Sequence, residues 1–187
     1  MPALVLPYKE VKTQIMEGDI LLFRGDSWVS KIISSQTDTT YSHVGIASWV
    51  NGDANTEDGQ LECVEFREGY GGRAVNLEVE VNRLPNCIDV YRPIPIFAKM
   101  VYDLNTKRVE FTTKEFNGKA VTRTMRKMTG LPYGWKRIWW MAKKKLLFFR
   151  FFSKESLMND KLKDVVYPVC STTAAYAFTK NDFDLLY

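Results

Sequence analysis

Apolar runs of strand length, each bounded by turn residues, dominate the first half of the sequence. Their β-branched and aromatic content is typical of strands that pack against a core. Asn51 and Gly52 begin a long turn between two of the runs, and Pro93 and Pro95 end the last one. The pattern predicts a turn and strand within 17–24 and further strands at 43–50, 61–66, 74–81 and 87–91.

Helical spacing replaces the strand pattern in the second half. Thr112 and Glu115 have the spacing of a capping box. Apolar positions on one helical face follow at Ala120, Val121, Met125 and Met128. A break at 130–134 ends this helix, and 171–178 predicts another that is rich in small residues. Strands followed by helices predict an α+β fold.

Size and composition indicate one folded domain over 1–187. The 187 residues are 45% hydrophobic and 26% charged, which is enough for one sizeable core. No stretch approaches the roughly 18 uncharged apolar residues of a membrane-spanning helix. The beginning of the chain has no basic region, and Pro7 interrupts its short apolar run. We therefore expect neither a signal peptide nor a transmembrane helix, and a cytoplasmic protein, with membrane-peripheral or virion association as alternatives.

Positive charge is concentrated in one segment. The formal net charge is +4, yet residues 136–163 contain nine basic and two acidic side chains, so the remainder is slightly acidic. Within it, the stretch from Trp135 to Phe152 mixes aromatic and basic residues. This stretch is either an interfacial element for an anionic membrane surface or a core helix or lid with a solvated lysine run. Nucleic-acid binding is disfavoured because the basic charge is local.

The cysteine and histidine content argues against a disulfide scaffold and a zinc site. The three cysteines have no ligand-pair spacing, and His43 is the only histidine. No cofactor or metal is predicted. Cys63 and Cys87 lie in apolar strand patterns, which favours a packing role.

His43 and Cys170 can form a nucleophile and base pair. His43 begins a predicted strand, and imidazole exchanges a proton near neutral pH. Cys170 follows Pro168 and lies near the N-terminus of the helix predicted at 171–178, where the helix dipole and free N–H groups would stabilise a thiolate. The plain alternatives are a structural histidine at a sheet edge and a small buried thiol.

A third group is needed to orient the imidazole, and two carboxylates are candidates. Glu62 and Glu65 lie in the strand predicted after the histidine strand. Strand side chains alternate between faces, so these two point in opposite directions and only one can face His43. Residue types alone leave both open.

The order of short motifs resembles a known family. The motifs are Gly18-Asp19-Ile20-Leu21, Ser42-His43-Val44-Gly45-Ile46, Val64-Glu65-Phe66, Gly130-Leu131-Pro132-Tyr133 and Cys170-Ser171. Together they resemble the circularly permuted NlpC-type papain-fold cysteine peptidases and amidases, a group that includes lecithin–retinol-acyltransferase-like enzymes. The resemblance implies a single permuted papain-like domain over 1–187, with an aromatic and basic insertion at about 135–152. In this fold an antiparallel sheet or small barrel carries the histidine and packs against the cysteine helix.

The resemblance also implies roles for individual residues. Cys170 matches the nucleophile, His43 the general base and Glu65 the orienting residue, with Glu62 as the alternative because the turn at 51–60 is long. Tyr133 and Ser171 match positions on the oxyanion and substrate side. Asp19 matches a common position of the family, and we assign it a structural role in turn bonding.

These residues predict thiol-dependent acyl transfer. The first expectation is a cysteine peptidase or amidase that cleaves an amide through a thioester at Cys170. A lipid-directed acyltransferase or esterase at a membrane surface, and a non-catalytic binding protein that retains the fold, are the alternatives. The expected substrates are therefore a peptide, another amide or an acyl lipid.

Overall fold

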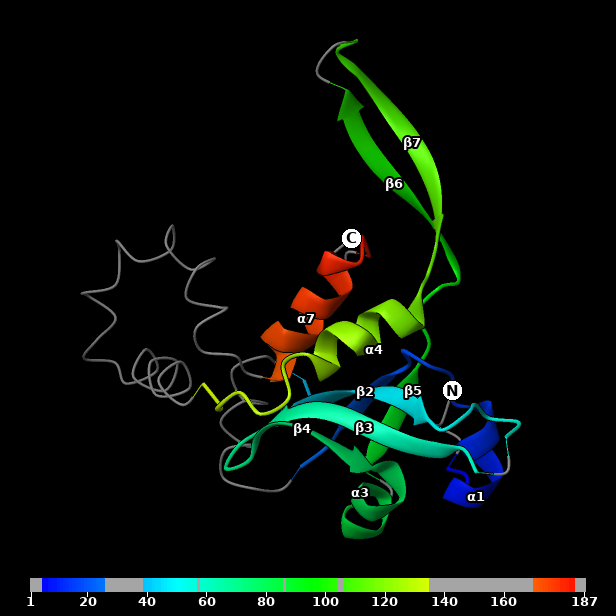
Figure 1. The fold of residues 1–187 in the computed structure, drawn as a ribbon, viewed down its shortest axis with the longest axis vertical. Helices are drawn as coiled ribbons and strands as arrows, with labels where there is room; N and C mark the ends of the chain where they lie inside the picture. Colours follow the sequence, from blue (N-terminus) through cyan, green and yellow to red (C-terminus); the bar gives the residue numbers. More distant parts are fainter. Residues whose placement is uncertain are drawn as a thin grey trace, which may run out of the picture.

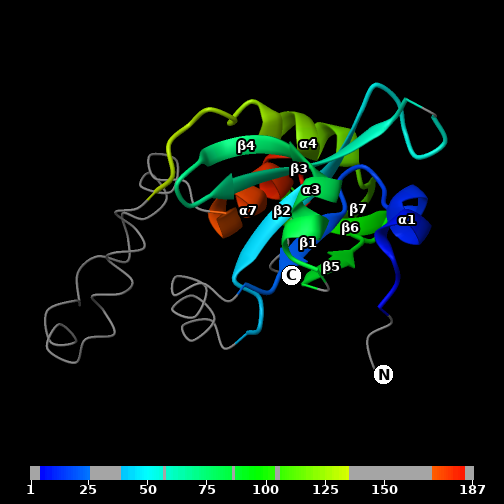
Figure 2. The same ribbon diagram turned by 90° about the horizontal axis from the view of Figure 1, so that it is seen from below.

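An antiparallel five-stranded sheet forms the centre of the computed structural model, which describes residues 5–25, 39–56, 58–85, 87–103, 106–134 and 170–183. The strands are β1 (Ile20–Phe23), β2 (His43–Val50), β3 (Gln60–Arg67), β4 (Gly71–Asn76) and β5 (Ile88–Tyr91). They lie in the order β4-β3-β2-β1-β5, which can be followed across Figure 2. The described helical elements are α1 (Tyr8–Val11), the 3-10 helix η1 (Lys12–Gln14), α3 (Leu77–Arg83), α4 (Gly118–Arg126) and α7 (Cys170–Lys180). The fold is therefore α+β, as the sequence predicts.

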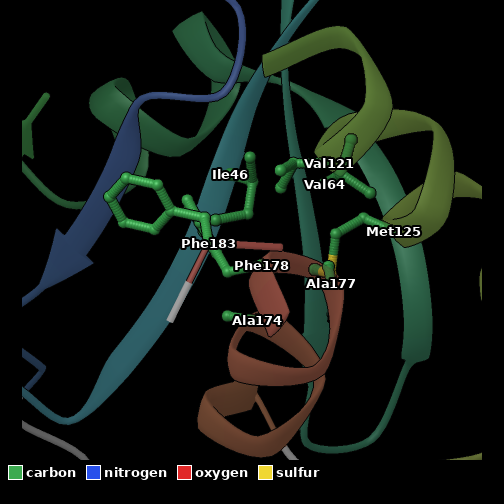
Figure 3. Close-up of a cluster of buried hydrophobic side chains, with 8 residues drawn as sticks. All are labelled: Ile46, Val64, Val121, Met125, Ala174, Ala177, Phe178 and Phe183. Atoms are coloured by element: carbon green, nitrogen blue, oxygen red, sulfur yellow. The ribbon is translucent and has the colours of Figure 1, made fainter. Parts of the chain in front are cut away.

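Helices cover both faces of the sheet (Figure 1). On one face α4 and α7 pack against each other and against β2 and β3. Ile46 and Val64 point from these strands into that layer, where they meet Met125 and Phe178. Figure 3 shows this core, whose fully or almost fully buried members are Ile46, Val64, Val121, Met125, Ala174, Ala177, Phe178 and Phe183. The small side chains of α7 allow that helix to lie close to the sheet.

The opposite face carries α3 and a second core. Residues that alternate with the first set point to this side, because successive strand side chains face opposite ways. Leu77 of α3 is buried here against the sheet. The buried members of this cluster are Ile15, Leu21, Phe23, Ala47, Leu61, Cys63 and Leu77.

The turn before β1 depends on Gly18 and Asp19. Gly18 has a φ of +88° and lies so close to Gly118 that a Cβ would be 2.6 Å from the Gly118 Cα. Asp19 is buried, and its Oδ2 accepts a hydrogen bond from the Met16 N–H at 2.8 Å. Arg92 pairs with the same carboxylate. The expected turn-bonding role of Asp19 is confirmed.

The strand predicted at 74–81 is wrong in its second half. β4 ends at Asn76, and α3 follows directly. The Asn76 side chain accepts a hydrogen bond from the Glu78 N–H and caps α3. Leu77 and Glu80 are both buried on the face of α3 that meets the sheet. Leu77 and Glu80 are three positions apart, so a helix buries both on one face, and this outweighs the preference of the neighbouring valines for a strand.

The capping box predicted at Thr112 and Glu115 is also wrong. Both residues belong to β7 (Arg108–Glu115), which pairs with β6 (Ile96–Asp103) in a two-stranded hairpin. Figure 1 shows this hairpin extending away from the main sheet. The next helix is α4, and its cap is Asn117, whose side chain accepts from the Ala120 N–H at 3.0 Å. Strands are therefore not confined to the first half of the chain.

The remaining strand predictions and the helix at 171–178 are confirmed. The aromatic and basic segment 135–152 lies outside the described residues, as does Pro168. Among the helices that the structure describes, none is both long enough and apolar enough to cross a bilayer.

Candidate active site

His43 is the first residue of β2 and binds Glu65 of the neighbouring strand. Its Nε2 lies 2.6 Å from Oε2 of Glu65. The His43 side chain is 14% exposed, and the Glu65 side chain is completely buried. Phe23, the register partner of His43 on β1, packs against the imidazole with ring centroids 5.1 Å apart. Both the position and the plane of the ring are thus constrained.

The pairing between β2 and β3 ends before it reaches His43. The ladder between β2 and β3 ends at the pair Gly45 and Glu65, whereas the ladder between β1 and β2 continues to His43. Beyond Gly45, the N–H of Val44 therefore has no partner on β3, and it donates a hydrogen bond to the sulfur of Cys170. The sulfur of Cys170 therefore contacts β2 just beyond the end of its ladder with β3.

Cys170 is the first residue of α7 and is almost buried, with 6% exposure. Burial alone would raise the pKa of its thiol. The hydrogen bond to His43 and the charge of His43 outweigh burial, and the backbone N–H groups of Val44 and Ser171 add to this effect. The net result is a pKa of Cys170 below its usual range, as expected for a thiol at a helix N-terminus beside an imidazolium.

The same interactions act on His43 and Glu65. Burial lowers the pKa of His43, but its hydrogen bonds to Cys170 and Glu65 and their negative charge raise the pKa to about 9. Burial raises the pKa of Glu65, and His43, Arg67 and Arg73 lower it to about 2. Since Nε2 of His43 binds Glu65, Nδ1 is the ring nitrogen left to face the sulfur. The favoured state is thiolate, imidazolium and carboxylate in a row.

Gly45 leaves space for the sulfur of Cys63, which lies beside Glu65. A Cβ at Gly45 would lie 2.3 Å from the sulfur of Cys63. That thiol is buried 3.8 Å from Oε2 of Glu65. Burial and the negative charge of Glu65 raise the pKa of Cys63 well above its ordinary value. Cys63 therefore stays a neutral packing thiol, in agreement with the role expected from its strand pattern.

Tyr133 reaches the site from the segment that follows α4. The N–H of Gly72 donates to the carbonyl of Leu131 at 2.9 Å, which ties this segment to β4. The hydroxyl of Tyr133 is hydrogen-bonded to Cys170. Burial raises the pKa of Tyr133, and the negative charges of Cys170 and Glu68 raise it further, so the phenol stays protonated and can donate.

Ser171 contributes to the site through its backbone. Its N–H donates to the sulfur of Cys170, whereas its side chain is exposed. The structure thus brings Cys170, His43, Glu65, Tyr133 and the Ser171 backbone together.

Glu62 lies away from the histidine. Its Oε2 accepts a hydrogen bond from Arg126 of α4 at 2.7 Å. The same guanidinium also binds Ser48. Glu62 therefore faces the α4 side of the sheet, and Glu65 is the carboxylate that contacts His43.

A group of charged residues behind Glu65 was missed by the sequence analysis. Arg73 of β4 donates to Oε1 of Glu65 from Nε at 2.7 Å and from Nη2 at 2.5 Å. Nη2 of Arg73 also binds Glu80 of α3 at 2.8 Å. Glu80 is 2% exposed and pairs with Arg67 and Arg83 as well. Arg73 is directly opposite Glu65 in the ladder, so a correct register for β4 would have indicated the pair.

Within the part of the chain that the structure describes, no group of three or more His, Cys, Asp or Glu side chains could hold a metal ion. The thiol of Cys170, the imidazole of His43 and the carboxylate of Glu65 form a continuous chain, and that arrangement can support covalent acyl transfer. No protein-family model matches the sequence, and no curated protein matches it.

Proposed function

We propose that this protein is a thiol-dependent acyl-transfer enzyme, specifically a cysteine peptidase or amidase with Cys170 as its nucleophile. The observation that carries the proposal is the continuous chain Cys170–His43–Glu65, in which Glu65 is 2.6 Å from the histidine. Nucleophile, base and orienter in hydrogen-bond contact are the geometric signature of covalent acyl transfer.

The reaction begins with the thiolate of Cys170. The sulfur attacks the carbonyl carbon of the substrate, and the carbonyl π electrons move to oxygen to give a tetrahedral oxyanion. The oxyanion collapses, the bond to the leaving amine breaks, and the imidazolium of His43 gives its proton to that nitrogen. A thioester on Cys170 and neutral His43 remain. His43 then accepts a proton from water as the water attacks the thioester, and the acid product leaves with the thiolate restored.

Hydrolysis of an amide fits the charge state of His43. An amine is a poor leaving group unless it is protonated as the C–N bond breaks. The pKa of His43 at about 9 keeps the imidazolium populated at neutral pH, so the proton is available when it is needed. An ester requires less help from the acid, so this feature favours the amide.

Tyr133 is the proposed oxyanion donor. Its hydroxyl lies at the sulfur, next to the carbon that the sulfur attacks. Burial keeps the phenol protonated, and a donor held in place in a water-poor site stabilises the developing charge. The backbone at the start of α7 is the second source of N–H donors.

The proposed fold assignment is the permuted NlpC type of papain-like domain. Two features support it: the histidine strand β2 precedes the cysteine helix α7 in the chain, and α7 packs on β2 and β3 of an antiparallel sheet. The motifs Ser42-His43-Val44-Gly45 and Cys170-Ser171 also meet, because His43 and Val44 both bind Cys170.

The test is acylation by an activated ester. The purified full chain would be treated with p-nitrophenyl acetate at pH 7, and each cysteine peptide would be read by mass spectrometry. The proposal predicts a hydroxylamine-sensitive acetyl group on Cys170 that forms faster than on Cys87, although Cys87 is the more exposed thiol. A panel of peptide and acyl-amide substrates would then be screened for turnover.

Variants at the two reacting residues complete the test. Cys170→Ala should abolish turnover and acylation at that position, and His43→Ala should slow acylation by about 10²–10⁴-fold. Cys87→Ser is the matched control and should leave both rates unchanged. Acetylation that follows exposure, with Cys87 ahead of Cys170, would contradict the proposal. Full turnover in a folded Cys170→Ala variant would do the same.

A further inference from the structure

We infer that Arg73 is a positioning residue of the proposed active site, which fixes one oxygen of Glu65 so that the other oxygen faces His43. The inference rests on the proposed function and extends it to a residue that touches neither the nucleophile nor the base in the described structure. The argument depends on how the two oxygens of Glu65 are used.

The two oxygens of Glu65 have separate partners. Oε1 accepts two hydrogen bonds from Arg73, at 2.7 and 2.5 Å. Oε2 accepts from His43 at 2.6 Å and from the thiol of Cys63 at 3.8 Å. Two charge-assisted hydrogen bonds from one planar group hold Oε1 in place on the Arg73 side, which leaves Oε2 directed at the imidazole.

Arg73 is itself held on two sides. Its Nη2 donates to Glu80 at 2.8 Å, and Glu80 is almost buried on α3. The ring of Tyr70 covers the guanidinium, with 4.5 Å between the ring centroid and Cζ of Arg73. A guanidinium anchored in this way loses little freedom when it binds the carboxylate, so it can position Glu65 accurately.

Arg67 does not duplicate this role. Its nearest atom is 3.5 Å from Oε1 of Glu65, and its shorter bond, at 2.8 Å, goes to Glu80. Arg83 pairs only with Glu80 among the described ion pairs. The charged and titratable groups that face Glu65 are His43 on β2, Cys63 and Arg67 on β3, Arg73 on β4 and, behind Arg73, Glu80 on α3.

The inference predicts two separable effects of Arg73. Loss of its charge leaves the buried Glu65 with less compensation, so Glu65 takes up a proton at a higher pH than in the wild type. A protonated Glu65 no longer stabilises the imidazolium, and the thiolate of Cys170 is lost with it. Loss of the two-point contact also frees the carboxylate to turn, which slows the reaction at every pH.

The test follows the rate of Cys170 alkylation by iodoacetamide between pH 4 and pH 8. Arg73→Gln should lower the rate at pH 6 by about 10–100-fold, the scale seen when a residue that orients a metal-binding side chain is lost. The pH at which its alkylation rate falls on the acid side should also be higher than in the wild type. Arg73→Lys keeps the charge, so it should restore the acid limb but only part of the rate.

Two controls separate positioning from folding. Arg126→Gln breaks a similar ion pair to Glu62 on the same strand, and it should lower the melting temperature without moving the alkylation profile. In a Glu65→Gln background, Arg73→Gln should cause little further loss, because the carboxylate it positions is already gone.

The outcomes distinguish this inference from the proposed function. A folded Arg73→Gln variant with the wild-type profile would overturn the role of Arg73 alone. An equal shift in Arg126→Gln would also overturn it, because the effect would then be structural. A wild-type Cys170 that behaves as an ordinary thiol would overturn both proposals.

Discussion

Replacing Glu65 with glutamine exchanges one carboxylate oxygen for an amide NH₂ and tests the order of the proposed chain. Arg73 has only donors to offer, so the glutamine must turn its oxygen towards Arg73. Its NH₂ then faces Nε2 of His43. That nitrogen has to become the acceptor, and the proton of neutral His43 moves to Nδ1, the side that faces Cys170.

The expected loss has two sources. The rise in the pKa of His43 from 6.5 to about 9 corresponds to about 3 kcal/mol in favour of the imidazolium, and Glu65 supplies part of it. The second source is the tautomer, because an imidazole that already carries its proton on Nδ1 cannot take the proton of the thiol. When the histidine of a Ser-His-Asp triad is held in the wrong tautomer by an Asp→Asn change, kcat falls about 10⁴-fold. We therefore expect Glu65→Gln to slow acylation of Cys170 by about 10³–10⁴-fold.

The assay is the rate of p-nitrophenyl acetate acylation at Cys170, measured with the melting temperature of each variant. Glu62→Gln is the matched control, since it makes the same change at the carboxylate that binds Arg126 on the other face. It should alter stability and leave acylation within about threefold of wild type. A folded Glu65→Gln variant with wild-type acylation, or an equal loss in Glu62→Gln, would refute the assignment of Glu65 as the orienting residue.

Three further predictions follow from the same geometry. Tyr133→Phe should lower turnover on an amide substrate by about 10²–10³-fold, because the hydroxyl is needed for the oxyanion. Alkylation of Cys170 should fall much less, since the hydroxyl is only one of several donors to the sulfur, and an equal loss in both assays would contradict the oxyanion role. Gly45→Ala should destabilise the fold by about 1–3 kcal/mol in urea unfolding, because its Cβ would overlap the sulfur of Cys63 at 2.3 Å. Adding Cys63→Ala should recover much of that loss, whereas no destabilisation would show that the strands have room to move. Acid should weaken the fold through Glu65, whose pKa is about 2 in the folded protein and 4.5 as a free side chain. Its stabilisation of about 3 kcal/mol is therefore present above pH 4.5 and is lost as the pH falls towards 2. The urea midpoint should decline less over this range in Glu65→Gln than in wild type.

The residues at the centre of the site could be predicted because local patterns determine them. The boundaries of β2 match the predicted strand 43–50, which places His43 at its start. Strand alternation separates Glu62 from Glu65, and the structure follows that alternation. Cys170 was expected near the N-terminus of its helix, and it is the first residue of α7. Choosing between the two glutamates from residue types alone was not feasible, since the choice depends on which face of β3 lies next to His43.

The ion pairs of Arg73 and Glu80 behind the site could not be predicted. They depend on helix α3, whose residues have a local preference for strand. Residues 74–81 include three valines and read as a strand. The cap at Asn76 and the burial of Leu77 make the second part helical, and this turns Glu80 towards Arg73. Assignment as a strand hides that contact. The hairpin of β6 and β7 is the reverse case, a strand interpreted as the start of a helix. It was missed because Thr112 and Glu115 of β7 have the spacing of a helix cap.

The most direct test of the account is the pH dependence of iodoacetamide labelling at each of the three cysteines, in wild type and in His43→Ala. The structure predicts that Cys170 labels fast at pH 6 despite its burial, while Cys63 and Cys87 do not, and that His43→Ala removes the difference. A Cys170 that is inert, or that titrates near the ~8.5 of a free thiol in the wild type, would contradict the thiolate–imidazolium pair and with it the proposed chemistry.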